Sequence, residues 1–417
     1  MKTPDLKKRK YAKPLPSVVI AGANFGGLKA AVSLPKRFNV TVIDPEPYFE
    51  FSPNIHELIS GLKTPEMLRF SKQKAINRSG HHYLQETVTA ILPEQKKIIT
   101  TSGSTLSYDY CILSIGGQNN TAVVKGAEKH AMPFKSVRQC YDIAKRIEIL
   151  TSGKRKISIV IAGGGFEGIE ALGEILRKYK NSRGLQVHIV EKQKRLMADT
   201  PTDIDSEIRR LCNDFPVTFH TGKTITRVWK HSVDLSDKSK LSSQVTIWNI
   251  GTRPPDILYE SKLTDAPNQW LNVKSTLQHM AYPEIFAAGD IAGMPFPLRK
   301  QAYHALDMGK TGAENIIRKH AGRKLKAFKP SSKPMLVSFG DLDAFLIDKK
   351  IVVAGPAIGL LKEAVFHYVM TDLDPSGAFL KAIHTSERAT AAAIKLASTM
   401  TVSPAALAKL GKVRIIK

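Results

Sequence analysis

The sequence predicts an α/β fold with two parallel sheets, and three observations support this prediction. An apolar strand, a glycine-rich turn and a helix follow one another twice, as SVVIAGANFGGLKAAVSL and as ISIVIAGGGFEGIEALGEIL. A second strand comes after each copy, as NVTVIDP and as LQVHIVEK. The 417 residues are 42% hydrophobic, which is enough to bury the cores of about two or three domains.

The first copy predicts a Rossmann-like dinucleotide site. Its glycines allow a tight turn beneath a pyrophosphate, and the following helix offers its N-terminal amides to the anion. Asp44 ends the next strand about 20 residues further on, where a carboxylate can bind ribose hydroxyls. Asn24 replaces the second glycine of the pattern, but Asn tolerates unusual backbone angles and its amide can donate to phosphate. The binding residues predicted here are Gly22, Asn24, Gly26, Gly27 and Asp44.

The second copy predicts a second dinucleotide site. Glu191, at the end of its next strand, would accept hydrogen bonds from a 2′-hydroxyl and repel a 2′-phosphate, which favours NADH. Lys192, Lys194 and Arg195 follow directly and could neutralise the extra phosphate, so NADPH is the alternative. The binding residues predicted here are Gly163, Gly165, Gly168 and Glu191.

Glu167 departs from the pattern of the second loop. It places a carboxylate among the amides that would receive a dianionic pyrophosphate. Either this side chain points to solvent or it impairs nucleotide binding, and the sequence leaves both interpretations open.

Three later strands also end in glycine. They are YDYCILSIGG, which ends at Gly116, SQVTIWNIGTRPPD, which ends at Gly251, and EIFAAGDIAG, which ends at Gly289 and Asp290. In open α/β sheets, ligands bind at the C-terminal ends of the strands. We therefore expect these four residues to contribute to cofactor binding.

Cysteine usage and charge exclude several classes. Cys111, Cys140 and Cys212 are isolated, so no CxxC pair can form a redox-active disulfide, and no residue cluster predicts a metal site. The formal net charge of +25 would attract polyanions, but no nucleic-acid motif with interleaved aromatics is present. No apolar run approaches the roughly 18 residues of a membrane span, and the N-terminus lacks a secretory signal, so a cytoplasmic location is expected.

With these motifs in order, residues 17–325 resemble the two-dinucleotide-binding-domain flavoproteins of the pyridine nucleotide-disulfide oxidoreductase superfamily. Within it, the chain is most similar to type II NADH:quinone oxidoreductases and to apoptosis-inducing-factor-like flavoproteins of the ferroptosis-suppressor type. The resemblance implies FAD at the first loop and NADH, or alternatively NADPH, at the second. It also implies that the strand ending in Gly116 closes over the flavin and that Asp290 binds the ribitol.

The resemblance further implies a split FAD domain. The order expected is a basic tail (1–16), the first part of the FAD domain (17–124), an NAD(P)H domain (125–272), the second part of the FAD domain (273–325) and a smaller C-terminal α+β region (326–417). That last region contains short strands and apolar stripes. It is expected to contact either an anionic membrane surface or a second copy in a homodimer, and a membrane contact would place the chain peripherally on the inner face.

Five residues are catalytic candidates by the same resemblance. The segment FSPNIHELISG would put Pro53, His56 and Glu57 near the isoalloxazine, and Glu170 would neighbour the nicotinamide. Lys300 would stabilise the anionic reduced flavin. Tyr303 could stack on a planar acceptor, and His56 or His304 could supply a proton. The catalytic candidates are thus His56, Glu170, Lys300, Tyr303 and His304.

The acceptor motif of the quinone enzymes, Ala-Gln-x-Ala-x-Gln, is changed. Here it reads Ala302-Tyr303-His304-Ala305-Leu306-Asp307, so both glutamines are absent. Two functions therefore stay open. One is transfer of electrons from NADH through flavin to a quinone or other small acceptor, and the other is direct oxidation of a small organic substrate with a vestigial NAD domain.

Overall fold

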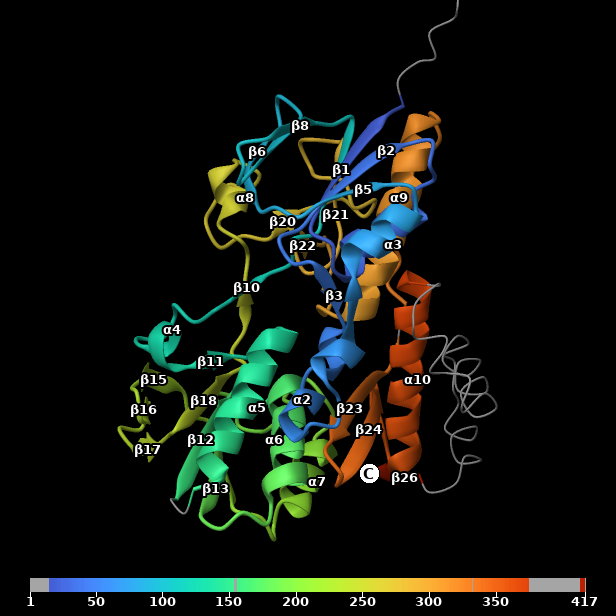
Figure 1. Cartoon of the computed structure of the whole chain (residues 1–417). Helices are drawn as coiled ribbons and strands as arrows, with labels where there is room; N and C mark the ends of the chain where they lie inside the picture. Colours follow the sequence, from blue (N-terminus) through green and yellow to red (C-terminus); the bar gives the residue numbers. More distant parts are fainter. Residues whose placement is uncertain (1–14, 154–155, 332, 375–412, 417) are drawn as a thin grey trace, which may run out of the picture. The chain divides into compact units, whose positions relative to one another are not determined.

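The structure is a computed structural model that describes residues 15–153, 156–331, 333–374 and 413–416. Its contacts divide the chain into two units (Figure 1). The first comprises Met1–Pro47, Lys72–Gly116 and Pro255–Lys329, and the second comprises Tyr48–Ser71, Gly117–Pro254 and Pro330–Lys417. The chain therefore enters the second unit three times, which brings distant segments of the sequence together there.

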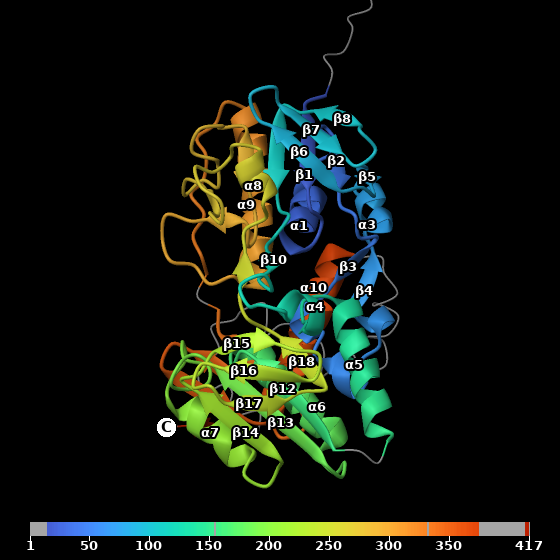
Figure 2. The same cartoon turned by 90° about the vertical axis from the view of Figure 1, so that its left-hand side faces the viewer.

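A five-stranded parallel sheet forms the centre of the first unit, in the order β21-β9-β1-β2-β5. Its strands are β1 (Ser17–Ala21), β2 (Asn39–Ile43), β5 (His82–Leu84), β9 (Tyr110–Leu113) and β21 (Ile285–Ala287). The helices of this unit include α1 (Phe25–Ser33), α3 (Lys72–Arg78) and α9 (Ala302–His320). Helices α1 and α9 lie side by side (Figure 2), and a Cβ added at Gly309 would lie 2.1 Å from the Gly26 carbonyl oxygen.

A second five-stranded parallel sheet forms the centre of the second unit, in the order β11-β18-β12-β13-β14. Its strands are β11 (Met132–Pro133), β12 (Ile157–Ala162), β13 (Leu185–Glu191), β14 (Val217–Thr221) and β18 (Val245–Trp248). The associated helices are α5 (Val137–Thr151), α6 (Phe166–Tyr179) and α7 (Asp203–Leu211). Every residue of β12 is buried, as expected of a strand covered on both faces.

The two sheets share a further feature. A three-stranded antiparallel sheet is inserted before the fourth long strand of each unit and packs on one face of the main sheet. These insertions are β6 (Val88–Leu92), β7 (Lys97–Thr100) and β8 (Thr105–Ser107) in the first unit, and β15 (Ile225–Val228), β16 (Ser232–Leu235) and β17 (Lys240–Ser242) in the second. The predicted α/β class with two Rossmann-like sheets is confirmed.

The second unit also contains an antiparallel sheet covered by a long helix. The strands are β23 (Met335–Phe339), β24 (Asp343–Asp348), β25 (Ile351–Ala354) and β26 (Arg414–Ile416), and the helix is α10 (Pro356–Leu373). Another pair, β3 (Tyr48–Glu50) and β4 (Arg69–Ser71), encloses η1 (Ser52–Asn54), α2 (Glu57–Ser60) and η2 (Pro65–Leu68). The short remaining elements are β10 (Gln118–Asn119), α4 (Ala127–His130), β19 (Thr252–Arg253), α8 (Ile257–Glu260), β20 (Leu271–Asn272) and β22 (Ala292–Gly293).

The units divide the chain at other residues than the boundaries that the sequence predicts. Residues 48–71 and 117–124 group with the second unit, whereas residues 255–272 group with the first. The predicted basic tail (1–16) lies outside the described residues except for residues 15 and 16. The apolar stripes of residues 388–400 and 403–417 also lie outside them, except for residues 413–416. The predicted domain boundaries stay a prediction.

Candidate dinucleotide and redox site

The glycine loops of the two units have the same backbone geometry. Gly22 and Gly163 both have positive φ, of 89° and 104°, which an L side chain rarely adopts. Their N–H groups donate to the carbonyl oxygens at the ends of the neighbouring strands, Ile43 at 2.8 Å and Val190 at 2.9 Å. Each loop therefore turns sharply from the first strand of its sheet into the helix.

Close packing of helix on loop is also repeated. A Cβ added at Gly27 would lie 1.8 Å from the Gly22 carbonyl oxygen, and one added at Gly168 would lie 2.0 Å from that of Gly163. Only glycine fits at these two positions, which is the role of the third glycine in a dinucleotide loop. Both loops thus fit the group that the sequence predicts for them.

A carboxylate braces each loop from the adjacent strand. Asp44 accepts hydrogen bonds from the Ala23 N–H at 2.6 Å and from the Glu46 N–H at 2.9 Å. Glu191 accepts from the Gly164 N–H at 2.7 Å and from the Gln193 N–H at 2.8 Å. The predicted ribose-binding acids therefore lie directly beside their loops in both units.

The two departures from the glycine pattern are accommodated without strain. Asn24 has φ −90° and ψ −150°, and Gly165, at the equivalent position, has φ −79° and ψ −166°. Any residue adopts these extended angles, so Asn24 does not need the conformational tolerance that the sequence analysis invoked. Glu167 is exposed at the start of α6.

The strand-end glycines match between the units as well. Gly116 after β9 and Gly251 after β18 have φ of 67° and 61°. Gly289 follows β21 with φ 81°, and Asp290 comes next. The described neighbours of Gly116 leave open space where a Cβ would be. These positions lie at the C-terminal ends of parallel strands, where ligands bind.

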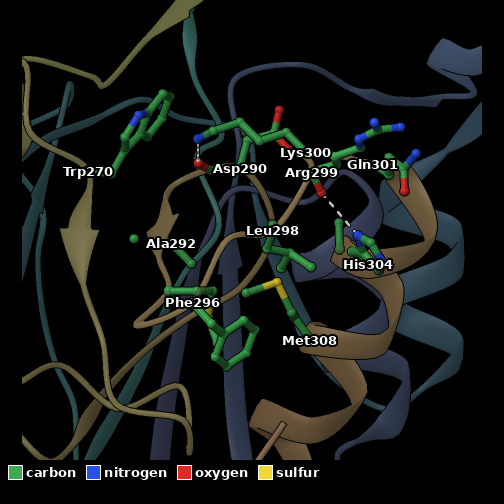
Figure 3. Close-up of a pocket in the computed structure, with 14 residues that line it drawn as sticks. Trp270, Asp290, Ala292, Phe296, Leu298, Arg299, Lys300, Gln301, His304 and Met308 are labelled. Carbon is green, nitrogen blue, oxygen red and sulfur yellow. Dashed lines mark hydrogen bonds between the residues drawn. The ribbon is translucent and has the colours of Figure 1, made fainter. Parts of the chain in front are cut away.

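A pocket in the first unit brings together several predicted residues (Figure 3). Gly289, Asp290, Lys300 and His304 line it, together with Trp270 and apolar side chains including Phe296, Leu298 and Met308. Lys300 donates to the Asp290 carbonyl oxygen and lies over the ring of Trp270. His304 Nδ1 lies 3.0 Å from the Arg299 carbonyl oxygen. Tyr303 contacts the ring of His304 edge-on, with 5.2 Å between the ring centroids.

A buried triad of charged and polar side chains lies in the second unit and comprises His56, which directly precedes α2, Glu170 of α6 and Lys362 of α10. The Lys362 Nζ lies 2.5 Å from Glu170 Oε1 and 3.3 Å from His56 Nε2. The His56 Nδ1 lies 3.4 Å from Glu170 Oε2. The Ser338 N–H also donates to Glu170 Oε1, at 3.2 Å. The structure thus joins two predicted residues, His56 and Glu170, through a lysine that the sequence analysis did not single out.

Burial shifts the pKa values of this triad. It raises the pKa of Glu170, an effect that the nearby Lys362 ammonium partly offsets. It also holds the pKa of His56 well below its usual range, and the Lys362 charge adds to that shift. His56 is therefore a neutral imidazole at neutral pH, which allows it to accept a proton or a hydrogen bond from Lys362.

A second cluster of charged side chains in the same unit contains Glu57 and Lys63. The Lys63 Nζ lies 3.8 Å from Glu57 Oε2 and 2.5 Å from Glu363 Oε1. His367 Nε2 lies 3.4 Å from the same Glu363 oxygen. The side chains of Glu57 and Lys63 are 8% and 6% exposed, whereas that of Glu363 is 37% exposed. Burial raises the pKa of Glu57 to about 7.

Three lysines of these clusters were missed from the sequence. Lys72 pairs with Asp44 at 2.7 Å and is 3% exposed, and Lys63 and Lys362 are buried as described above. Lys362 left one signal, because it interrupts the apolar run PAIGLLKEAVF at a position that faces the core. Lys63 and Lys72 lie in ordinary polar stretches and left none.

Residues 16–309, which are more than half of the chain, match the sequence pattern of the pyridine nucleotide-disulphide oxidoreductase family. The chain belongs to this family. It is therefore an oxidoreductase that uses FAD and a pyridine nucleotide.

Relatives within the family share low identity over most of their length. The chain is 24% identical to demethylphylloquinone reductase NdbB of Synechocystis sp. over 85% of this chain and 92% of that one. It is also 24% identical to type II NADH:quinone oxidoreductase of Staphylococcus epidermidis, over 84% and 93%. The chain is therefore similar to whole proteins and not to isolated domains of them.

Solved structures of the family show the same fold. NDH2 from Plasmodium falciparum in complex with NADH superposes with a TM-score of 0.76 at 17% identity, over 85% of this chain and 95% of that one. The sulfide:quinone oxidoreductase from Aquifex aeolicus superposes with a TM-score of 0.78 at 16% identity, over 96% and 97%. At these identities the similarity concerns the fold alone.

The family's name refers to a disulphide, but this chain shows no disulphide bond between its cysteines. All three cysteines are free and buried. Burial raises the pKa of Cys212 to about 12 and shifts the pKa values of Cys111 and Cys140 upward as well. Burial disfavours the thiolate form, which is the reactive form of cysteine.

The described residues contain no group of three or more His, Cys, Asp or Glu side chains that could hold a metal ion. They also contain no helix that is both long and apolar enough to cross a membrane.

Proposed function

We propose that this chain is a type II-like NADH:quinone oxidoreductase, which oxidises NADH and delivers two electrons to a quinone. The observation that carries the proposal is the repeated loop-and-carboxylate geometry of the two units, found in a chain whose relatives at full length bear that activity in their names. FAD, when bound, accepts the hydride of NADH and returns the two electrons to the acceptor. The protein supplies the binding groups, the orientation and the exclusion of water.

Each half would hold its nucleotide with the residues already described. Around the loop of the first unit, Gly22, Asn24, Gly26 and Gly27 would face the FAD pyrophosphate, with Asp44 on the ribose and Asp290 on the ribitol. In the second unit, Gly163, Gly165 and Gly168 would face the NADH pyrophosphate, with Glu191 on the ribose. Gly116, Gly251 and Gly289 would let the backbone approach the rings.

The neighbours of Glu191 favour NADH over NADPH. Of the three cations that follow Glu191, Arg195 has a guanidinium that donates to the carbonyl oxygens of four residues of its own loop, namely Met197, Ala198, Thr200 and Pro201. Lys192 and Lys194 are exposed. The Arg195 guanidinium already donates to backbone carbonyl oxygens, so it is not available to bind a 2′-phosphate. The Glu191 carboxylate would repel that phosphate, which favours NADH.

The acceptor contacts must differ from those of the quinone enzymes that carry both glutamines. Tyr303 and Asp307 occupy those positions here, at the start of α9. We propose that Tyr303 and His304 contact the acceptor and that Lys300 opposes the charge of the reduced flavin, since Lys300 and His304 line one pocket. These roles rest on the resemblance and on that pocket.

A stopped-flow experiment tests the proposal. Purified yellow protein is mixed anaerobically with NADH or NADPH while the flavin absorbance is followed, and a soluble quinone is then added. We expect NADH to bleach the flavin faster than NADPH and the quinone to restore the colour. No bleaching by either nucleotide would favour the alternative, a flavin-dependent oxidase acting on a small organic substrate. Exposure of Glu167 weakens one of the two reasons for that alternative, and the absence of both glutamines is the other.

The place of action is part of the same proposal. Quinones reside in lipid, and the net charge of +25 suits an anionic surface, so we propose a cytoplasmic protein that binds peripherally to the inner face of a membrane. Sedimentation with anionic and with neutral vesicles tests this, because only the anionic vesicles should retain the protein, and less of it at high salt. Light scattering of the same preparation would show whether the chain forms the homodimer that the sequence analysis considered.

A further inference from the structure

We propose that Asn249, the residue directly after β18, binds the nicotinamide nucleoside of NADH through its side-chain amide. The inference rests on the proposed function and adds one residue to its NADH site. Two observations carry it. The Asn249 amide is shielded from solvent with both of its polar atoms unpaired, and it lies beside the glycine loop of the second unit on the side away from Glu191.

The Asn249 amide has no hydrogen-bond partner. Its Nδ2 and its Oδ1 are both shielded from solvent, and neither meets a donor or acceptor among the residues that the structure describes. The other described side chains with unpaired buried atoms leave only one such atom each. An unpaired buried amide is less stable than an apolar side chain of the same shape, so it calls for a group that pairs with it in another state.

The backbone around Asn249 is held firmly beside the loop. The Asn249 N–H donates to the Ala162 carbonyl oxygen at 2.9 Å, which continues the pairing of β18 with β12. A Cβ added at Gly163 would lie 3.1 Å from the Asn249 carbonyl oxygen. Trp248 is 2% exposed and donates from its Nε1 to the Asn120 carbonyl oxygen at 3.3 Å. The main chain of Asn249 is thus fully bonded, and only its side chain lacks partners.

The order of the strands assigns this position to one half of the ligand. Strand β12 lies between β13 and β18 (Figure 2). A dinucleotide binds across such a sheet with its pyrophosphate on the loop after the central strand. Because Glu191 at the end of β13 would take the ribose of the adenosine, the other nucleoside would lie over the end of β18. Asn249 is the first residue there.

The chemistry of the amide selects the group that it binds. The Asn249 Nδ2 carries two donors, and Oδ1 is an acceptor. A pyrophosphate oxygen only accepts, so it would leave Oδ1 unpaired. A ribose hydroxyl and the carboxamide of nicotinamide can each donate and accept. Asn249 as a residue is partly exposed, so rotation about its side-chain bonds brings the amide to either group.

The first unit has a different polar residue at the same position. Ser114 directly follows β9, and its N–H donates to the Ala21 carbonyl oxygen at 2.7 Å. A Cβ added at Gly22 would meet the Ser114 carbonyl oxygen, as one at Gly163 meets that of Asn249. Ser114 is not among the side chains with unpaired buried atoms. The two strand ends therefore share their backbone geometry, and the unpaired amide belongs to the second unit.

The test uses the full-length protein loaded with FAD, and three variants of it. Asn249→Leu removes the donors and the acceptor at similar volume, and Asn249→Ser keeps a hydroxyl. Gln186→Met is the matched control, because it removes an amide of the same sheet whose Nε2 donates to Thr218 Oγ1 at 3.1 Å. Calorimetry measures the dissociation constants of ADP, ADP-ribose and NAD⁺. These ligands share the adenosine and the diphosphate, and they add the second ribose and then the nicotinamide.

We expect Asn249→Leu to weaken the binding of NAD⁺ by about tenfold to a hundredfold and that of ADP by less than about 2-fold. If the amide binds the ribose, ADP-ribose should lose as much affinity as NAD⁺. If it binds the carboxamide, ADP-ribose should keep its affinity. Asn249→Ser should recover part of the loss, and Gln186→Met should bind all three ligands like the unaltered protein.

Thermal unfolding separates this role from a structural one. Without ligand, Asn249→Leu should unfold at the same or a higher temperature, because the substitution breaks no hydrogen bond of the side chain. Added NAD⁺ should raise the unfolding temperature of the unaltered protein more than that of the variant. The inference is overturned if the affinities for the three ligands stay unchanged in Asn249→Leu or fall by one common factor. Failure of the unaltered protein to bind either ADP or NAD⁺ would overturn the proposed function, and this inference with it.

Discussion

The two halves, one in each unit, have loops of the same backbone geometry but differ in the charged groups beside those loops. Both have a positive-φ glycine at the strand end, a glycine beneath the helix and a carboxylate that accepts two N–H groups. In the first half, Asp44 is also paired at 2.7 Å with Lys72, which is 3% exposed. No cation pairs with Glu191 in the part of the chain that the structure describes. The two loops therefore share their geometry and differ in the charges beside their carboxylates.

The difference in charge pairing between Asp44 and Glu191 suits a resident cofactor in the first half and an exchanging substrate in the second. A site for a resident cofactor benefits from groups that are fully paired before the cofactor binds, because preorganisation lowers the cost of binding. A site for a substrate that must enter and leave keeps its carboxylate available to the ribose. Asp44 with Lys72 fits the first description, and Glu191 fits the second.

The largest expected effect comes from filling the space beneath the helix. Gly27→Ala places a Cβ 1.8 Å from the Gly22 carbonyl oxygen, and Gly168→Ala places one 2.0 Å from that of Gly163. Overpacking of this kind costs about 1–3 kcal/mol or more. We expect Gly27→Ala to purify with at least about tenfold less flavin, and Gly168→Ala to keep its flavin but lose bleaching by NADH. Absorbance ratios and stopped-flow traces measure both.

Gly165→Ala is the control for that pair of variants. A Cβ at Gly165 meets no described atom within 4 Å, and its φ of −79° suits alanine. Asn24 occupies the equivalent position in the first half. Bleaching by NADH should therefore survive in Gly165→Ala. Loss of bleaching there would mean that the two loops hold their pyrophosphates differently, which would break the comparison.

What the sequence could predict follows this same division. The α/β class, the two loops and the acids Asp44 and Glu191 could all be predicted, because each depends on local pattern: strand, glycine turn, helix and second strand. The position of His56 beside Glu170 could not, since 114 residues separate them and contact depends on how α2 packs on α6. Lys362 comes from a third segment. Buried lysines of this kind have no sequence pattern, because only tertiary packing decides which lysine is enclosed.

Removing the buried cation of the first half is expected to have the next largest effect on flavin binding, although its cost in stability is larger. Lys72→Met keeps the side-chain volume but leaves the Asp44 carboxylate buried without its partner. Breaking a buried ion pair from one side typically costs about 3–5 kcal/mol. We expect a lower midpoint of thermal unfolding and easier loss of flavin on dilution. Lys74→Met, on the exposed side of α3, is the control, and equal stability of the two variants would show that Asp44 does not depend on Lys72.

Glu57 provides a pH-dependent test in the second half. Its pKa is about 7 in the folded protein against an ordinary value of 4.5, so between these values the folded chain holds a proton that the unfolded chain has released. Stability from this group therefore falls as pH rises from about 4.5 to about 7, by at most about 3 kcal/mol. Glu57→Gln should remove that slope, so its unfolding midpoint relative to the unaltered protein should rise between pH 5 and pH 8. Parallel melting curves across that range would refute a raised pKa.

The smallest predicted effect concerns the carboxylate that distinguishes the second half. Glu191→Gln keeps an oxygen that can accept from the Gly164 N–H but removes the charge that repels a 2′-phosphate. We expect the ratio of kcat/KM for NADPH to that for NADH to rise about tenfold, which corresponds to about 1.4 kcal/mol. Lys192→Met, which alters an exposed neighbour, should change the ratio much less. If the ratio stays constant in Glu191→Gln, the carboxylate only braces the loop, as Asp44 does, and the two halves differ less than their charges suggest.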